Sequence, residues 1–188
     1  RDRGDRQESL PITDFDALIA NGLTFCRAPR TGWEYSNLGY ALLGRVISTV
    51  TGDDFTDVVR RELLEPLGMN STGFDPRLLP PDRLAVGHHP HGDELVREDI
   101  ITPGAFSPMG GLLSSVNDLA VWVGGFQESW RTDIDGGTHP LSRASRREMQ
   151  EPLRLARTEL ITQPGPPVAV TTCYGCLLYT SPSPRDLS

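Results

Sequence analysis

The fold is decided by residues 28–44, which read APRTGWEYSNLGYALLG. A Tyr-Ser-Asn triplet at residues 35–37 closes a loop that contains Pro and Gly, and an apolar run follows at once. The apolar positions recur at the three- and four-residue spacing of one helix face as far as Val50. Gly52 then supplies the left-handed residue that ends many helices. The spacing therefore predicts a helix after a loop, with the triplet at their junction.

Four more helices are predicted where a capping residue precedes apolar residues at helical spacing. The first is expected to start at Thr13, in a capping box with Asp16, and to stop at Asn21-Gly22. The second is expected to start at Asp53 or Asp54 and to end at Pro66 and Gly68, and the third to start at Ser115, in a capping box with Asp118. The fourth is expected to start at Ser142 and to stop near Pro152, with arginines on its exposed side. The helix after Asp53 is expected to pack on its predecessor as a hairpin. Strands are expected only around Ala85-Val86, Leu95-Val96 and residues 168–172. The sequence thus predicts a mostly helical chain.

Composition excludes several classes of protein. The net charge is −7 and the arginines are scattered, whereas a nucleic-acid-binding protein needs a concentrated basic face. No apolar run reaches the roughly 20 residues of a membrane span, and residues 1–6 are not a signal peptide. The compartment stays open between the bacterial cytoplasm and export. All eighteen basic residues are arginines, so a mechanism that needs a lysine amine cannot be complete within this sequence.

Residues 28–44 resemble the second active-site motif of the serine β-lactamase and penicillin-binding-protein superfamily, which is Tyr-x-Asn followed by a Gly-Tyr helix. The likeness continues in order through residues 64–69, 72–74, 110–115 and 118–120, and it covers most of the chain from 10 to 126. It implies an α+β fold of the β-lactamase/transpeptidase type. The chain would supply mostly the helical domain and its loops, with little of the antiparallel sheet.

The resemblance implies acyl transfer, in which a serine attacks a carbonyl and water or another acceptor releases the acyl-enzyme. In that superfamily the serine lies in S-x-x-K and the third motif is K-T-G or H-x-G, and the sequence contains neither of the lysine motifs. Tyr35 would exchange a proton near the serine, and Asn37 would hydrogen-bond the lysine and the substrate carbonyl. Ser36 would be a helix N-cap. The substrate bond would be an amide, a β-lactam or an ester.

Residues 1–175 are accordingly interpreted as a partial domain, with the nucleophile expected before Arg1 and the third motif after Gly175. The segment CLLYTSPSPRD that begins at Cys176 matches one reading frame of a common sequencing adaptor. Residues 176–188 are therefore interpreted as a non-native tail. The family also usually has Pro-Gly where this chain has Pro29-Arg30, which bears on the loop geometry only.

Several alternatives stay open. Tyr35 can be an ordinary buried aromatic and Asn37 a simple helix cap, in a helical interaction domain unrelated to the superfamily. The chain can also belong to a non-catalytic relative that binds peptide or cell-wall fragments in the same cleft. An enzyme would take a small-molecule or peptide substrate. The oligomeric state is not predicted.

No metal or organic cofactor is expected. The loop residues His88, His89 and His91, with Asp93 and Glu94, lack the fixed spacing of structural zinc sites. Gly110-Gly111 can place backbone N–H groups near an oxyanion, but a tight turn before Ser115 explains the two glycines equally well, and the turn is the favoured interpretation.

Overall fold

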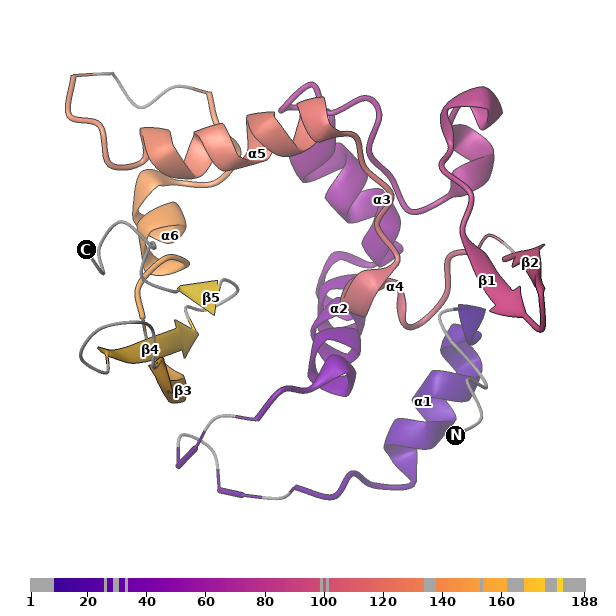
Figure 1. Ribbon diagram of the computed structural model, residues 1–188, viewed down its shortest axis with the longest axis horizontal. Coiled ribbons are helices and arrows are strands. Elements are labelled where there is room, and N and C mark those ends of the chain that lie inside the picture. The colour runs from indigo at the N-terminus through magenta and orange to yellow at the C-terminus, as the bar shows by residue number, and fades with distance from the viewer. Residues whose placement is uncertain are drawn as a thin grey trace. The chain divides into compact units, whose positions relative to one another are not determined.

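The computed structural model describes residues 9–25, 27–28, 31–32, 34–98, 100, 102–133, 138–152, 154–161, 168–174 and 179–180. The chain divides into two compact units, Arg1–Leu23 with Ser36–Trp122 and Thr24–Tyr35 with Val123–Ser188. Figure 1 labels their helices and strands. Pro29-Arg30 and most of the predicted tail lie outside the described residues.

The first unit is mostly helical, as predicted. It contains α1 (Ile12–Ala20), α2 (Asn37–Thr51), α3 (Phe55–Val59) continued by the π-helix η2 (Arg60–Leu64), the 3-10 turns η3 (Pro76–Leu78) and η4 (Pro81–Arg83), the hairpin of β1 (His88–His91) and β2 (Glu94–Arg97), α4 (Ser107–Gly110), and the first half of α5 (Val116–Glu128). Among the described residues, no helix is both long and apolar enough to cross a bilayer.

The second unit holds the rest of α5, α6 (Arg143–Glu148) and a small antiparallel sheet in the order β3 (Arg154–Ile161), β4 (Val168–Tyr174), β5 (Tyr179–Thr180). The expected strand at residues 168–172 is confirmed as part of β4. β3 was not predicted from the sequence, and it pairs with β4 along its length, with a register shift between Leu155 and Arg157.

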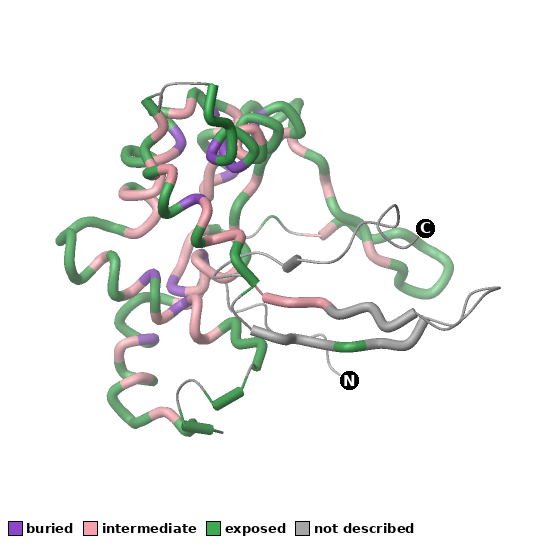
Figure 2. The backbone as a smooth tube through the Cα atoms, turned by 90° about the vertical axis from the view of Figure 1, so that its left-hand side faces the viewer, coloured by how far each residue is buried: buried purple, intermediate pink, exposed green. Residues whose placement is uncertain are grey.

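The core of the first unit gathers around Phe15, Ala41 and Ala105, which are at most 3% exposed. The ring of Phe15 meets that of Phe106 edge to face, with centroids 5.4 Å apart. A backbone hydrogen bond of 2.8 Å from Ala105 N to Leu10 O joins the same segments. Buried positions are few along the tube in Figure 2, and burial of these rings against α2 is what holds α1 in place.

Helix α2 also packs on α3 and α4, which confirms contact between the two helices of the predicted hairpin. The contact with α4 requires a glycine, because a Cβ at Gly44 would meet Cβ of Pro108 at 2.8 Å and its Cγ at a still shorter distance. Gly52 ends α2 with φ +78°, as its sequence position predicts.

Side chains of α6 and of Gln150, which follows it, donate to carbonyls in the last turn of α5 and just after it. Arg146 Nη1 donates to Gly125 O at 2.5 Å, and Arg147 Nε donates to Ser129 O at 2.6 Å. Gln150 Nε2 donates to Phe126 O at 3.4 Å. The last carbonyls of a helix lack partners within it, and positive charge there is favourable, so α6 serves as a side-chain cap for α5.

Three sequence-based expectations were wrong in detail. Pro11, not Thr13, is the N-cap of α1, and it makes no side-chain hydrogen bond. The first strand of the hairpin lies at His88–His91, after the expected Ala85-Val86. Arg146 is 2% exposed, although the arginines of α6 were expected on its outer side.

Candidate active site

The site begins with the cap of α2. Ser36 has extended backbone angles (φ −141°, ψ 105°), and its Oγ accepts a hydrogen bond of 3.0 Å from Gly39 N. This is the usual N-cap geometry, which satisfies one backbone donor of the first turn. The expectation that Ser36 caps the helix is therefore confirmed, and its hydroxyl is occupied by the backbone.

The two predicted site residues flank this cap. Tyr35 is the last residue before Ser36, and its side chain is 58% exposed. Asn37 is the first residue of α2 and is exposed as well. The interpretation of Tyr35 as a buried aromatic is therefore wrong. Because Tyr35 is assigned to the second unit and Asn37 to the first, each is described by its own surroundings.

The helix that carries Asn37 is anchored by an ion pair. Arg45 donates from Nε to Asp16 Oδ1 at 2.6 Å and from Nη2 to Asp16 Oδ2 at 2.8 Å, which joins α2 to α1 in a two-point contact. The Arg45 hydrogen bonds hold the pKa of the Asp16 carboxyl below its usual range. Both groups thus stay charged at neutral pH, and α2 keeps a fixed position on α1.

A buried polar cluster that the sequence did not predict joins three of the motif-bearing segments. Asp118 is 8% exposed, and its Oδ2 accepts from Ser71 N at 2.8 Å and from Thr72 Oγ1 at 2.7 Å. Thr72 Oγ1 also lies 2.8 Å from Ser114 Oγ. The only sequence signal was the capping box, which is half correct because Asp118 N donates to Ser115 Oγ at 3.2 Å. The Asp118 carboxylate instead fixes the turn after the π-helix against the start of α5.

Gly110-Gly111 forms the end of α4. Gly111 has φ −83°, and its N–H donates to Ser107 O at 3.1 Å. That N–H is therefore engaged within the chain. The favoured interpretation as a chain reversal before Ser115 agrees with this geometry, whereas an oxyanion role for Gly111 N does not.

The histidines near residue 90 form the β-hairpin of the first unit. His88 pairs with Arg97 and His91 with Glu94, and His89 Nδ1 lies 3.6 Å from Glu98 Oε1. Within the described part of the chain, no three His, Cys, Asp or Glu side chains gather as a metal site would require.

Comparison with known proteins assigns the chain to a family. The family model described as Beta-lactamase matches residues 18–184. A human beta-lactamase-like protein is 35% identical over 122 residues, which are 63% of this chain and 22% of that protein. Penicillin-binding protein 4* of Bacillus subtilis is 36% identical over 77 residues, which are 41% of this chain and 17% of that protein.

Solved structures agree. The octameric penicillin-binding protein homologue from Pyrococcus abyssi superposes with a TM-score of 0.61 at 26% identity, over 79% of this chain and 30% of that one. The matched residues span less than a third of each of these three relatives. The predicted β-lactamase/transpeptidase-like fold is confirmed, and the unrelated helical domain is excluded. The chain belongs to the Beta-lactamase family.

Proposed function

We propose that Tyr35 and Asn37 are second-motif residues of a serine hydrolase that cleaves amide, β-lactam or ester bonds through an acyl-enzyme. The nucleophilic serine and its lysine would come from chain outside the 188 residues, since these contain no lysine. In this assignment Tyr35 exchanges a proton with the serine or the leaving group, and Asn37 orients the lysine and the substrate carbonyl. Neither role requires a metal or a cofactor.

The observation that carries the proposal is the cap of α2. Because Ser36 Oγ is bonded to Gly39 N at 3.0 Å, the residue between the two site side chains is fixed to the backbone. Tyr35 precedes Ser36 in the chain and Asn37 follows it, and both are exposed. Catalytic side chains need a rigid support of this kind, because small displacements from the productive geometry reduce the rate strongly.

The test starts with the full-length gene, recovered from the source DNA. The expected result is S-x-x-K upstream, and turnover of nitrocefin or of a p-nitrophenyl ester by the encoded protein. Tyr35→Phe and Asn37→Ala should each lower kcat/KM by a factor on the order of 10²–10⁴. Asn117→Ala is the matched control, since Asn117 is also an exposed Asn in the first turn of a helix, α5, and should keep full activity.

A full-length protein without the serine and lysine would overturn the proposal and favour the non-catalytic relative. In that case a muropeptide or penicillin should still bind, and no covalent adduct should appear by mass spectrometry. An active enzyme that tolerates Tyr35→Phe and Asn37→Ala as well as Asn117→Ala would also contradict it, because the activity would then reside elsewhere.

A further inference from the structure

A cavity of about 220 Å³ lies within the first unit, bounded by α3, η2 and residues 69–79. The buried part of its lining is mainly apolar, since Leu64 and Met69 are 6% and 3% exposed; Thr72, at 8%, is the buried polar residue there, and its Oγ1 is bonded to Asp118 Oδ2. Phe74 adds an aromatic ring, which is held edge to face by Phe55 with centroids 5.5 Å apart. Leu78 also lines the cavity and is 77% exposed, so part of the apolar lining is accessible to solvent.

The π-helix forms one wall of this cavity. Glu65 N donates to Arg60 O at 2.9 Å, a bond that spans five residues in place of the usual four. Arg60, Leu64 and Glu65, from this wide turn and its end, all line the cavity. A π-turn inside an α-helix is rare and occurs frequently at functional sites, so its position here is a second observation that points to the same place.

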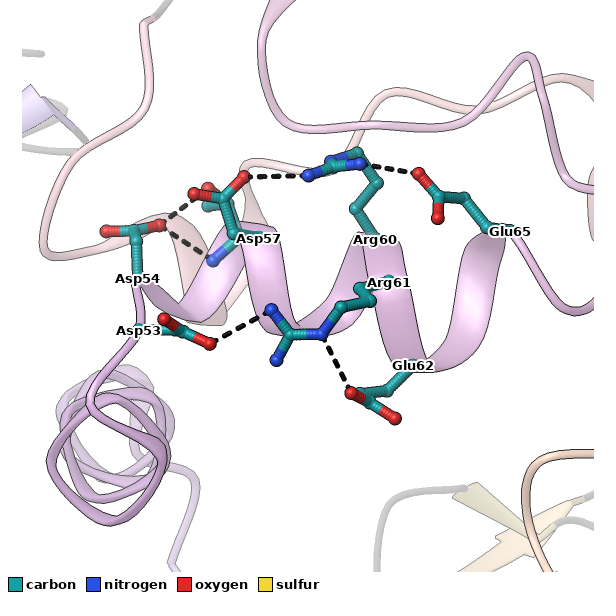
Figure 3. Close-up of polar contacts among 8 residues, drawn as sticks. Asp53, Asp54, Asp57, Arg60, Arg61, Glu62 and Glu65 are labelled. Atoms are coloured by element: carbon teal, nitrogen blue, oxygen red, sulfur yellow. Dashed lines mark hydrogen bonds and ion pairs between the residues drawn. The ribbon is translucent and has the colours of Figure 1, made fainter.

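The charged part of the lining is acidic. Asp57, Glu65 and Asp75 supply three carboxylates; Asp75 is paired with Arg77, which is outside the lining, and Asp57 and Glu65 share the single guanidinium of Arg60. Arg60 lies between two of them, with Nη1 bonded to Glu65 Oε1 at 2.5 Å and Nη2 bonded to Asp57 Oδ1 at 3.3 Å, as Figure 3 shows. Both carboxylates keep a second oxygen for which the described residues supply no hydrogen bond.

We propose that this cavity binds a small organic cation, with an apolar body against Leu64, Met69 and Phe74 and an ammonium group at Asp57 and Glu65. An apolar cavity of about 150 Å³ holds a benzene ring, so a volume of about 220 Å³ has room for a ring with a short amine chain. Ligand sites are typically apolar with a few placed polar groups, and this lining has that composition. Tyr35 and Asn37 are not among the lining residues, and binding here does not depend on acyl transfer.

An anionic ligand is disfavoured by the same contacts. Arg60 is the only cationic residue of the lining, and two carboxylates already occupy its guanidinium. An anion would have to displace one of them and approach the others. A cation, in contrast, is attracted by Asp57 and Glu65, whose two negative charges exceed the single positive charge of Arg60.

The first experiment titrates the unmodified chain by isothermal calorimetry with 2-phenylethylamine, 2-phenylethanol and 3-phenylpropanoate. The amine should bind at least about tenfold more tightly than the alcohol, and the carboxylate should bind most weakly. The ratio of the affinity for the amine to that for the alcohol should fall as the salt concentration rises from about 10 mM to about 150 mM, because Asp57 and Glu65 are about half exposed and salt therefore screens their charges. Equal binding of amine and alcohol, or no binding of the amine, would overturn the proposal.

Variants of the two arginine-centred clusters in Figure 3 provide matched controls. Glu65→Gln should weaken amine binding at least about threefold, whereas Glu62→Gln should leave it unchanged, because Glu62 pairs with Arg61 outside the lining. Arg60→Gln should strengthen amine binding by removing the competing cation, and Arg61→Gln should not. Loss of amine binding in a folded Arg60→Gln variant, or equal effects of the two glutamate variants, would refute the assignment.

Discussion

At Gly44 the absence of a side chain sets the distance between α2 and α4. Gly44→Ala would drive a methyl group into Pro108, while Phe55 Cδ2 lies 3.5 Å away on the same side. We expect a loss of about 1–3 kcal/mol in the free energy of unfolding, the usual cost of overpacking. Urea denaturation measures this loss.

Gly39→Ala, in the same helix, is the control. The nearest atoms to a Cβ at that position are those of Ser36 at 3.5 Å, an ordinary contact. Removing glycine flexibility from a helix should then stabilise the protein by up to about 1 kcal/mol. Equal effects of the two substitutions would show that Gly44 and Pro108 do not pack as described.

His139 makes the stability of the second unit depend on pH. Burial, and next the charge of Arg146, lower the pKa of His139, against weaker opposing effects of Leu141 and Glu128. Its Nδ1 lies 3.0 Å from Leu141 N, which donates to the neutral ring, and 3.2 Å from Leu141 O, which accepts from a protonated Nδ1. The folded state therefore favours the neutral imidazole.

The direction of this pH dependence follows from the difference in proton binding between the unfolded and the folded chain. As pH falls below about 6.5, the unfolded chain takes up a proton before the folded one does, so stability present above that pH is lost as pH falls through the lowered folded pKa. Urea midpoints between about pH 8 and about pH 5 should fall less steeply for His139→Asn than for the parent. His91→Gln, at an exposed strand end, should keep the parent slope. The same slope for all three proteins would contradict a half-buried, neutral His139.

At the scale of the secondary-structure elements, α6 stabilises α5 mainly through hydrogen bonds that its side chains donate to backbone carbonyls. Arg147 bonds to Ser129 O at 2.6 Å, and its guanidinium lies 5.3 Å from the centre of the Trp130 ring. Arg147→Met should cost about 1.5–3 kcal/mol, because it removes a charged donor from a part-buried carbonyl and the cation–π contact. Thermal or urea unfolding monitored by tryptophan fluorescence would measure this cost.

Arg131→Met is the comparison at the same end of α5. Arg131 pairs with Asp133 at 2.7 Å, but its side chain is 55% exposed, and exposed ion pairs contribute about 0–1 kcal/mol. A cost for Arg131→Met that equals that of Arg147→Met would mean that capping by α6 is not what stabilises this helix end.

Elements were predictable where their signals are local. Ser36, Asp54 and Ser142 cap the helices expected of them, since a cap needs only its own first turn. The start of α1 was missed because Asp16, assigned to a capping box with Thr13, pairs instead with Arg45, 29 residues away. Burial of Arg146 was missed because its partner Gly125 lies 21 residues away. Contacts between distant residues leave no periodic signal.

For the whole molecule, the motif order carried more information than any single residue. Segments 64–69, 72–74, 110–115 and 118–120 indicated the fold, and the structure joins three of them through Asp118, Ser71, Thr72 and Ser114. The sequence alone does not predict these hydrogen bonds, because serine, threonine and aspartate in loops are equally common in exposed turns. Tyr35 and Asn37 were predicted from their spacing and their neighbours, and their roles stay predictions.

Because the sequence contains no lysine, we expect the 188-residue chain to be inactive as a hydrolase. All eighteen basic residues are arginines, and a guanidinium stays protonated at any working pH, so none can replace the amine that activates the serine. The 188-residue chain should therefore hydrolyse neither nitrocefin nor p-nitrophenyl acetate above the buffer rate. The same assay with the full-length protein is the positive control. Turnover by the short chain that a serine-reactive inhibitor abolishes, and that Ser36→Ala also removes, would show that this sequence carries its own nucleophile.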